Sequence, residues 1–314
     1  MPAFFDPALV EKWGVGFISE GKIDESLRKL IPGAFITRGQ FKYPSQSELR
    51  DLAWNHMDQN HRPYIHRTYG EAMRVFVQQQ SAFSLTRFGR WPAVIPVFDG
   101  YFKENGFYQF VVVFGLFVIV NIMENKVVAN GTEIDISWLI ASHRWLRFAH
   151  PILNRRLTRV NEIQNREDDP VRDRRVTLRV QGFRFLTDEP DFVNSNVVEN
   201  NAIFPSPRNG ASIALSDLPN GRAIRVVLDN RAYVFRRKDQ GVEVWPGICV
   251  HEGAEIDASH LNNDVVKCPW HGLEFGARSL SRDGQTAVVC GAQLELAGNR
   301  IVLGAAPARP SGKG

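Results

Sequence analysis

Two short segments near the C-terminus each pair a cysteine with a histidine. Cys249 and His251 stand in C-x-H, and after sixteen intervening residues Cys268 and His271 stand in C-x-x-H. Thiolates and imidazoles bind borderline and soft transition metals, and four of them on two loops suit one metal centre. A glycine follows within two residues of each histidine, which suits a backbone that turns tightly around a metal. Any fold of this region must therefore bring the two loops together.

The mixed Cys/His pairing separates two kinds of metal centre. Structural zinc sites also use two Cys and two His, but zinc fingers usually place Cys with Cys and His with His. A Rieske [2Fe-2S] cluster holds one iron with two thiolates and the other with two imidazoles, so each loop supplies one of each. The segments CVHEGA and CPWHGLEFG resemble the ligand loops of Rieske proteins. The resemblance implies an electron-transfer protein whose cluster is bound by Cys249, His251, Cys268 and His271, with zinc as the alternative.

A second motif lies far upstream, in WNHMDQNHRPYIHRTYG, where Asp58, His61 and His66 form D-x-x-H-x-x-x-x-H. This resembles the mononuclear iron site of Rieske non-haem iron oxygenases. In that family the two histidines bind a catalytic Fe(II), the aspartate orients one of them and lies on the electron route from the cluster, and a later carboxylate completes the site. Two imidazoles and one carboxylate on one face leave open positions for O2 and substrate. The resemblance implies His61 and His66 as iron ligands and Asp58 as a catalytic residue.

The helical pattern around this motif must be interrupted. Residues five apart on an unbroken helix point about 140° away from each other, so His61 and His66 would diverge. Pro63 lacks an N–H and clashes with the preceding turn, so we expect a helix over residues 46–62, capped by Ser45, to end there. The alternative is a surface loop that carries two ordinary histidines.

The carboxylate that would complete the iron site is expected after a long helix. Apolar residues recur at spacings of three to four and predict an amphipathic helix over about 144–166. The acidic run Glu167, Asp168 and Asp169 follows, directly before Pro170. The family commonly has a Glu-Asp pair here, so the resemblance implies Asp168 as the ligand, with Asp169 as the alternative. A solvated face on which these acids pair with nearby arginines is the other interpretation.

The chain departs from the family in its domain order. Oxygenase α subunits of this type carry the Rieske domain before the catalytic domain, whereas here the iron motif comes first. In the family, electrons usually pass from the Rieske domain of one subunit to the iron of its neighbour, so the order along the chain does not exclude the iron site. The resemblance therefore also implies a homo-oligomer such as a trimer.

Strand and helix signals predict an α+β domain at the N-terminus, from helices over 7–30 and 46–62 and strands over 73–79, 81–88, 109–122 and 133–141. Together with the iron motif, this resembles the helix-grip fold of the oxygenase catalytic domains, a curved antiparallel sheet wrapped on a long helix around an apolar cavity. We predict a helix-grip domain over 1–186, a linker over 187–212, an all-β Rieske domain over 213–304 and a disordered tail over 305–314.

One uncharged stretch of eighteen residues, 106–123, is long enough to suggest a membrane span. Gln109, Gly115 and Asn121 interrupt it, and its Val, Ile and Phe content favours buried strands. We therefore expect strands here and no membrane span.

Charge and cysteine content narrow the class of protein. The 314 residues carry a formal net charge of +4, which is too mild for a nucleic-acid binder and suits docking of an acidic ferredoxin or a flavin reductase as electron donor. Of the three cysteines, two belong to the cluster motif and Cys290 reads as a buried apolar residue. Without paired cysteines or a leader pattern, a cytoplasmic protein is expected.

The resemblance implies a Rieske-type oxygenase that passes electrons from a [2Fe-2S] cluster to a mononuclear Fe(II), which activates O2 against an apolar small molecule. The alternative is a Rieske ferredoxin-like electron-transfer module fused to a helix-grip domain that binds a hydrophobic ligand without catalytic iron. In that case Asp58, His61 and His66 are structural. No motif encodes the substrate, because pocket residues in such folds are scattered over several strands.

Overall fold

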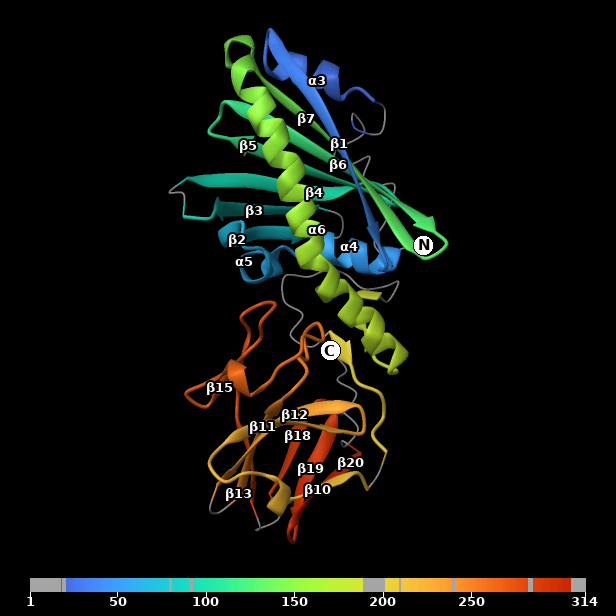
Figure 1. Cartoon of the computed structure of the whole chain (residues 1–314), viewed down its shortest axis with the longest axis vertical. Helices are drawn as coiled ribbons and strands as arrows, with labels where there is room; N and C mark the ends of the chain where they lie inside the picture. Colours follow the sequence, from blue (N-terminus) through green and yellow to red (C-terminus); the bar gives the residue numbers. More distant parts are fainter. Residues whose placement is uncertain are drawn as a thin grey trace. The chain divides into compact units, whose positions relative to one another are not determined.

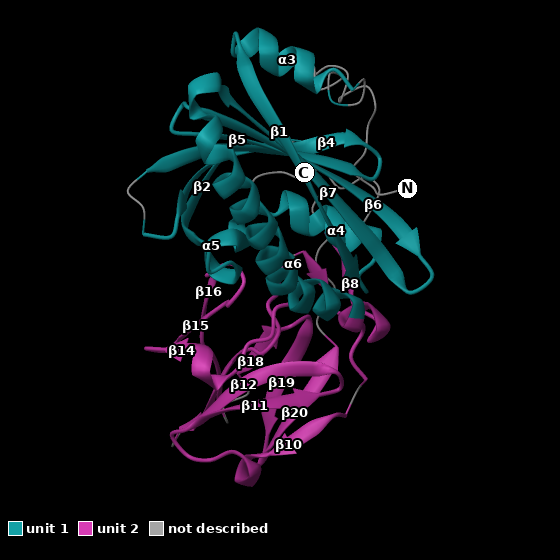
Figure 2. Ribbon diagram, turned by 45° about the horizontal axis from the view of Figure 1, so that its top comes forward, with its two compact units in different colours: residues 1–176, 187–198 teal, residues 177–186, 199–314 magenta. Residues whose placement is uncertain are grey.

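The chain forms two compact units (Figure 2), made of residues 1–176 with 187–198 and of residues 177–186 with 199–314. Each unit has its own hydrophobic core. In the described part of the chain, every helix is too short or too polar to cross a membrane. The computed structural model describes residues 18, 21–78, 81–90, 93–188, 201–208, 210–238, 241–281 and 285–305.

A seven-stranded antiparallel sheet dominates the described residues of the N-terminal unit (Figure 1). Its order, β1-β7-β6-β5-β4-β3-β2, places the first strand beside the last, and the strands from β2 to β7 pair with their neighbours along the chain. The strands are β1 Ala34–Ser45, β2 Tyr69–Gln78, β3 Ser81–Phe88, β4 Val94–Lys103, β5 Gly106–Val113, β6 Phe117–Val128 and β7 Gly131–His143.

Burial alternates along β3 and along most of β7, as expected for strands with one face on a core. We predicted one strand over 109–122, but the uncharged stretch forms two strands, β5 and β6. The chain reverses between them because Phe114 and Gly115 have φ angles of 54° and 66°. Strands β1 and β4 were not predicted.

Helices cover both faces of the sheet (Figure 1). The short helix α3 (Ile23–Leu30) packs on one face. On the other face lie α4 (Leu49–Met57) and the long helix α6 (His150–Val180), which bury Leu52 and half-bury Leu157 against the core. A sheet wrapped on one long helix confirms the predicted α+β helix-grip fold.

Helix α6 begins and ends later than predicted. Residues Arg144–Ala149 form a 3-10 helix, η2, and α6 starts at His150, so Pro151 occupies the first turn, where its missing N–H is not needed. The prediction that the helix ends before Pro170 was wrong, because α6 continues through it to Val180.

The segment predicted as a single helix over 46–62 is interrupted earlier than expected. Helix α4 ends at Met57, and the chain continues as a 3-10 turn, η1 (Gln59–His61), and a short helix, α5 (Arg62–Ile65). The break lies at Asp58, whose side chain accepts a hydrogen bond from the backbone N–H two residues on, at 3.3 Å. A local side-chain bond of this kind competes with helix continuation.

Two residues of this segment have other roles than predicted. Pro63 lies in the first turn of α5 and does not end a helix. Ser45 is the last residue of β1, where it pairs with Thr132, and Glu48 immediately precedes α4 without a side-chain cap.

The C-terminal domain is all-β, as predicted (Figure 1). Two four-stranded sheets, β10-β20-β19-β18 and β11-β12-β13-β17, contribute to one apolar core, and a third sheet joins β14, β15 and β16. The elements of this unit are β8 Arg184–Phe185, β9 Ala202–Ile203, β10 Ser212–Ala214, β11 Ala223–Leu228, β12 Arg231–Lys238, β13 Gly241–Pro246, β14 Leu261–Asn262, β15 Val265–Lys267, β16 Glu274–Gly276, β17 Arg278–Ser281, β18 Thr286–Val289, β19 Ala292–Ala297 and β20 Arg300–Ala305.

The division between the units differs from the predicted boundary at residue 186. Residues 177–186 group with the C-terminal unit, because Phe183 and Phe185 are buried there beside Ile248. Parts of three predicted segments lie outside the described residues: 7–17 of the first helix, 189–200 of the linker and 306–314 of the tail.

The last turns of α6 in the N-terminal unit are held by a buried charge network. Arg175 is fully buried, and its guanidinium nitrogens lie 3.3 Å from the carboxylate of Asp51 and 3.0 Å from that of Asp188. The guanidinium carbon also lies 4.1 Å from the centre of the Trp54 ring. These contacts anchor the part of α6 that follows Pro170.

We predict that Arg175→Ala destabilises the N-terminal unit, because it leaves the fully buried Asp51 without its counter-charge. The free energy of unfolding, measured by urea denaturation, should fall by about 3–5 kcal/mol. The double variant Arg175→Leu/Asp51→Leu should lose less, since the fully buried charge of Asp51 is also removed and only the less buried Asp188 loses an ion pair. A double variant less stable than Arg175→Ala would contradict this account.

Candidate metal centres

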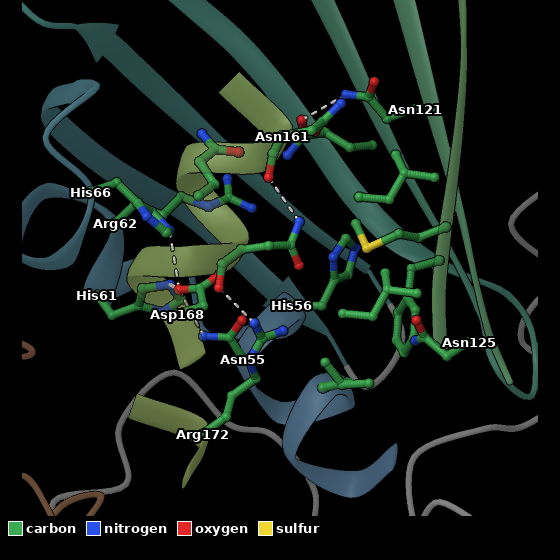
Figure 3. Close-up of a pocket in the computed structure, with 18 of the residues that line it drawn as sticks. Asn55, His56, His61, Arg62, His66, Asn121, Asn125, Asn161, Asp168 and Arg172 are labelled. Carbon is green, nitrogen blue, oxygen red and sulfur yellow. Dashed lines mark hydrogen bonds and ion pairs between the residues drawn. The ribbon is translucent and has the colours of Figure 1, made fainter. Parts of the chain in front are cut away.

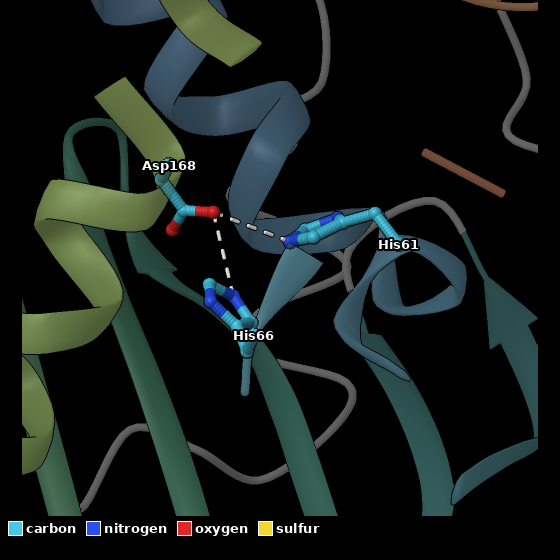
Figure 4. A group of neighbouring side chains, drawn as sticks. All are labelled: His61, His66 and Asp168. Atoms are coloured by element: carbon cyan, nitrogen blue, oxygen red, sulfur yellow. Dashed lines mark ion pairs between the residues drawn. The ribbon is translucent and has the colours of Figure 1, made fainter. Parts of the chain in front are cut away.

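Three predicted iron ligands meet between α6 and the segment that follows α4 (Figure 4). Asp168 Oδ1 lies 3.5 Å from His61 Nε2 and 3.4 Å from His66 Nε2. One ligand atom of each side chain lies within 4.8 Å of the other two. The three residues are only 2%, 5% and 9% exposed, for His61, His66 and Asp168. Two imidazoles and one carboxylate that converge in this way fit the ligand set of non-haem Fe(II).

The local backbone accounts for this convergence. His61 ends η1 and His66 directly follows α5, where its N–H donates to the carbonyl of Arg62 at 3.0 Å. The two turns therefore replace the straight helix on which the rings would diverge, and the ring centres lie 5.3 Å apart. Asn55 of α4 donates to Asp168 Oδ1 at 3.2 Å and fixes the carboxylate from a third direction.

Each histidine carries a second carboxylate on its other ring nitrogen. Asp58 Oδ2 lies 3.5 Å from His61 Nδ1, and Glu167 Oε2 lies 3.2 Å from His66 Nδ1. Outer carboxylates in this position fix the ring and its tautomer and leave Nε2 for a metal. The sequence predicted an orienting role for Asp58 but not for Glu167. The position of Glu167 directly before the predicted ligand Asp168 was the sequence signal that could have indicated this role.

Asp169, the alternative ligand, is directed elsewhere. Its carboxylate accepts hydrogen bonds from the Tyr43 hydroxyl and, at 2.9 Å, from Arg172. Burial and this bond to Asp169 raise the pKa of Tyr43 to about 12. The structure thus brings Asp168, and not Asp169, to the two histidines.

The pKa shifts in the site favour metal binding at Asp168 and His66 and oppose it at His61, which must lose its proton before a metal binds. Burial would raise the pKa of Asp168, but the rings of His66 and His61 hold it well below its usual range. Burial lowers the pKa of His66. Burial acts in the same direction on His61, but Asp168 and Asp58 outweigh it and raise the pKa of His61. An anionic carboxylate and neutral imidazoles are the forms that bind metals.

A cavity of about 70 Å³ opens beside these three side chains (Figure 3). We predicted an apolar cavity, and the lining is mixed: apolar side chains such as Leu52, Phe107 and Met123 lie beside amides that both the helix and the sheet present to it. The amides of its lining include Gln109, Asn121, Asn125, Asn161, Gln164 and Asn165.

The two Cys/His loops of the C-terminal unit adopt matching turns. Each cysteine carbonyl, of Cys249 and Cys268, accepts from the N–H of a glycine four residues on, Gly253 and Gly272, at 2.9 Å in both loops. Each cysteine N–H donates to the carbonyl five residues on, at 2.8 and 2.7 Å. The glycines have φ angles of 84° and 66°, in the left-handed region that side chains disfavour.

These turns bring the four predicted cluster ligands together. His251 Nδ1 and His271 Nδ1 lie 3.3 Å apart, while Cys249 and Cys268 are 0% and 1% exposed. A hydrogen bond from the Cys249 thiol lowers the pKa of Cys268 to about 5. Two buried sulfurs beside two imidazole nitrogens fit a [2Fe-2S] cluster with mixed ligation.

Cys290 lies apart from this group, as predicted for a buried structural residue. It is 3% exposed, and its Sγ lies 3.7 Å from the carbonyl oxygen of Ala232 and 3.8 Å from that of Ile248. Burial raises the pKa of this thiol to about 12, so it remains protonated.

A known protein family matches part of the C-terminal unit. Residues 211–289 match the family described as the Rieske [2Fe-2S] domain. The C-terminal unit contains a Rieske domain. The match spans both loops with matching turns and places the Rieske domain after the N-terminal unit, in the order that the motifs predicted. A Rieske domain supports a [2Fe-2S] electron-transfer module.

Solved structures resemble parts of the chain only remotely, and no curated protein matches it. The di-domain ARO/CYC StfQ from the steffimycin biosynthetic pathway has a TM-score of 0.41 and 9% identity, over 55% of this chain and 62% of StfQ. Mll3558 from Rhizobium loti has a TM-score of 0.35 and 9% identity, over 43% of this chain and 98% of its own. Ara h 8.0201 has a TM-score of 0.32 and 6% identity, over 41% of this chain and 95% of its own.

We predict that Cys249→Ser and Cys268→Ser each abolish the cluster, because each removes one of two buried thiolates. Iron and acid-labile sulfide per chain should fall by two each, and the visible absorption of the Rieske domain should disappear. Cys290→Ser, the matched control outside the loops, should keep both. A wild-type protein that holds zinc and no sulfide after anaerobic reconstitution would contradict the prediction.

Proposed function

We propose that this chain is a Rieske-type non-haem iron oxygenase, in which electrons received by the Rieske domain serve O2 activation at an iron site in the N-terminal unit. One observation carries the proposal: His61, His66 and Asp168 converge in the same chain as a Rieske domain. Their spacing along the sequence spans more than a hundred residues, so local structure alone does not produce this convergence.

The four side chains of the matching loops hold the cluster in this proposal. Cys249 and Cys268 supply sulfur to one iron, and His251 and His271 supply nitrogen to the other. When bound, a [2Fe-2S] cluster exchanges single electrons and a mononuclear ferrous ion activates O2.

In the N-terminal unit, His61 and His66 offer Nε2 and Asp168 offers one carboxylate oxygen. Three protein ligands leave open positions on the metal. Glu167 lies within hydrogen-bond distance of His66 Nδ1, at 3.2 Å, and Asp58 lies 3.5 Å from His61 Nδ1, so a carboxylate stands behind each ring before a metal binds.

The electron donor and substrate follow from the surroundings of the two sites. A formal net charge of +4 suits an acidic ferredoxin or a flavin reductase as donor. The substrate would occupy the cavity beside Asp168 and undergo hydroxylation, demethylation or desaturation.

A second candidate function is a Rieske electron-transfer module joined to a ligand-binding domain without catalytic iron. One observation favours it: the distance of 3.5 Å from Asp168 to His61, whose pKa is raised, also suits an ion pair with a protonated ring. The two functions differ in the number of irons bound per chain.

We predict three irons per chain after anaerobic loading with Fe(II), two in the cluster and one in the N-terminal unit. His61→Ala and Asp168→Ala should each lower the count to two and leave the Rieske spectrum unchanged. Asp169→Ala is the matched control, since its carboxylate is directed to Tyr43 and Arg172. Two irons in the loaded wild-type protein would exclude the oxygenase and favour the second candidate.

The outer carboxylates provide a finer test. Asp58→Asn and Glu167→Gln should each weaken binding of the third iron by about 10 to 100-fold, measured by competition with a chelator. The family resemblance assigns Asp58 alone to the electron route, so only Asp58→Asn should also slow reoxidation of the reduced cluster by O2 in fully loaded protein. Equal reoxidation rates in the two variants would remove Asp58 from that role.

A further inference from the structure

We infer that the cavity beside His61, His66 and Asp168 binds a neutral small molecule that carries both hydrogen-bond donors and acceptors, and not a hydrocarbon. The inference rests on the proposed function in one respect, since it assigns the substrate class to the cavity of that site. Two walls of the cavity, on α6 and on the sheet, carry amides, and several polar atoms of the lining lack partners among the described residues.

The face of α6 that packs on the sheet changes character along the helix. Ala149, Leu153 and Leu157 pack against the apolar core. The same stripe, continued at spacings of three and four, lines the cavity with Asn161, Gln164, Asn165, Asp168 and Arg172. The inward stripe of a helix is normally apolar, so a run of amides there indicates a polar occupant.

The sheet also changes from apolar to polar side chains where it lines the cavity. On one face of β6, Phe117 and Ile119 pack in the apolar core, and the next residues on that face are Asn121, Met123 and Asn125, which line the cavity. Gln109 of β5 lies opposite Asn121 in register, and its side-chain oxygen accepts from Asn121 Nδ2 at 3.1 Å. Amides therefore face amides across the cavity.

Several buried atoms of this lining have no hydrogen-bond partner among the described residues (Figure 3). They include Asn121 Oδ1, Asn125 Oδ1, Asn161 Nδ2, His56 Nε2 and Arg62 Nη1. The three asparagines are 6%, 5% and 9% exposed. A buried polar atom without a partner costs roughly 1–3 kcal/mol, so several around one cavity indicate bonds to a molecule that enters it. The set contains acceptors and donors, and the ligand needs both.

The charges around the cavity are already compensated, which favours a neutral ligand. Arg62 donates to Asp99 at 2.9 Å, and Arg172 donates to Asp169 at 2.9 Å. Burial lowers the pKa of His56 to about 4, so this ring is neutral near pH 7. A charged ligand would bring an unpaired charge into a buried site, at a large cost in free energy.

Water also satisfies amides, and a cavity of about 70 Å³ has room for several molecules. A ligand with donors and acceptors replaces those waters and keeps their hydrogen bonds. A hydrocarbon displaces them and leaves the amides unpaired, and sites of this kind discriminate strongly against such analogues.

Three six-membered rings of similar size test the inference: cyclohexane, cyclohexanone and δ-valerolactam. The first has no polar atom, the second accepts only, and the lactam donates and accepts. In ligand-observed NMR titrations of the full-length protein with its Rieske cluster, the lactam should bind at least about 10-fold more tightly than cyclohexane. Equal or tighter binding of cyclohexane, or a cavity that holds water and no lactam, would overturn the inference.

Two substitutions locate the binding. Asn125→Leu and Asn161→Leu lie on opposite walls and remove atoms that have no partner, so they should fold with at least wild-type thermal stability. Each should weaken lactam binding by about 10-fold and leave cyclohexane binding unchanged or stronger. Gln40→Leu removes an exposed amide outside the cavity and should change neither lactam binding nor cyclohexane binding. Unchanged lactam binding in both cavity variants would contradict the inference.

Iron counts on the same samples separate this inference from the proposed function. Preferred lactam binding with two irons per chain would overturn the oxygenase and support the polar cavity. Three irons per chain with no preference for the lactam would support the oxygenase and overturn the polar cavity.

Discussion

The N-terminal unit depends on how one face of α6 is buried against the sheet. Its first turns bury or half-bury apolar side chains such as Leu157, its middle turns line the cavity and supply Asp168, and Arg175 pairs with Asp51 further along. One element thus fixes a core, a binding surface and a metal ligand. A shift of one turn would move the carboxylate by about 5.4 Å, so apolar packing at one end determines the distance from Asp168 to both histidines.

The two candidate metal centres are constructed by different physical means. The Rieske loops are short, and each is closed by its own backbone hydrogen bonds around Gly253 or Gly272. The second centre gathers residues from two segments that are distant in the sequence, and a carboxylate lies behind each of the rings of His61 and His66. The first arrangement depends on local turn geometry, whereas the second depends on the packing of the whole unit.

This difference explains what the sequence could predict. The cluster ligands follow a local pattern. The family resemblance predicted His61, His66 and Asp168 as iron ligands, and it also predicted the helix-grip fold. The role of Glu167 was missed, because its partner lies 101 positions away in the sequence. The helix was expected to end before Pro170. The ion pair that anchors its later turns joins residues 124 positions apart, so the sequence carries no local sign of it. The polar stripe of α6 was visible at helical spacing, but the opposing amides of β6 became neighbours only in the folded sheet.

Pro170 gives α6 a property that a regular helix lacks. It has no N–H to bond the carbonyl of Arg166, four residues earlier, and Arg172 donates to the neighbouring carbonyl of Asn165 at 2.9 Å. The backbone ladder is therefore interrupted within two residues of Asp168, and a side chain spans the interruption. Helices bend most readily at such points. The turn of α6 that backbone hydrogen bonds support least is therefore the turn that carries the carboxylate, and the side chains of Asn55 and Arg172 stabilise it from two directions.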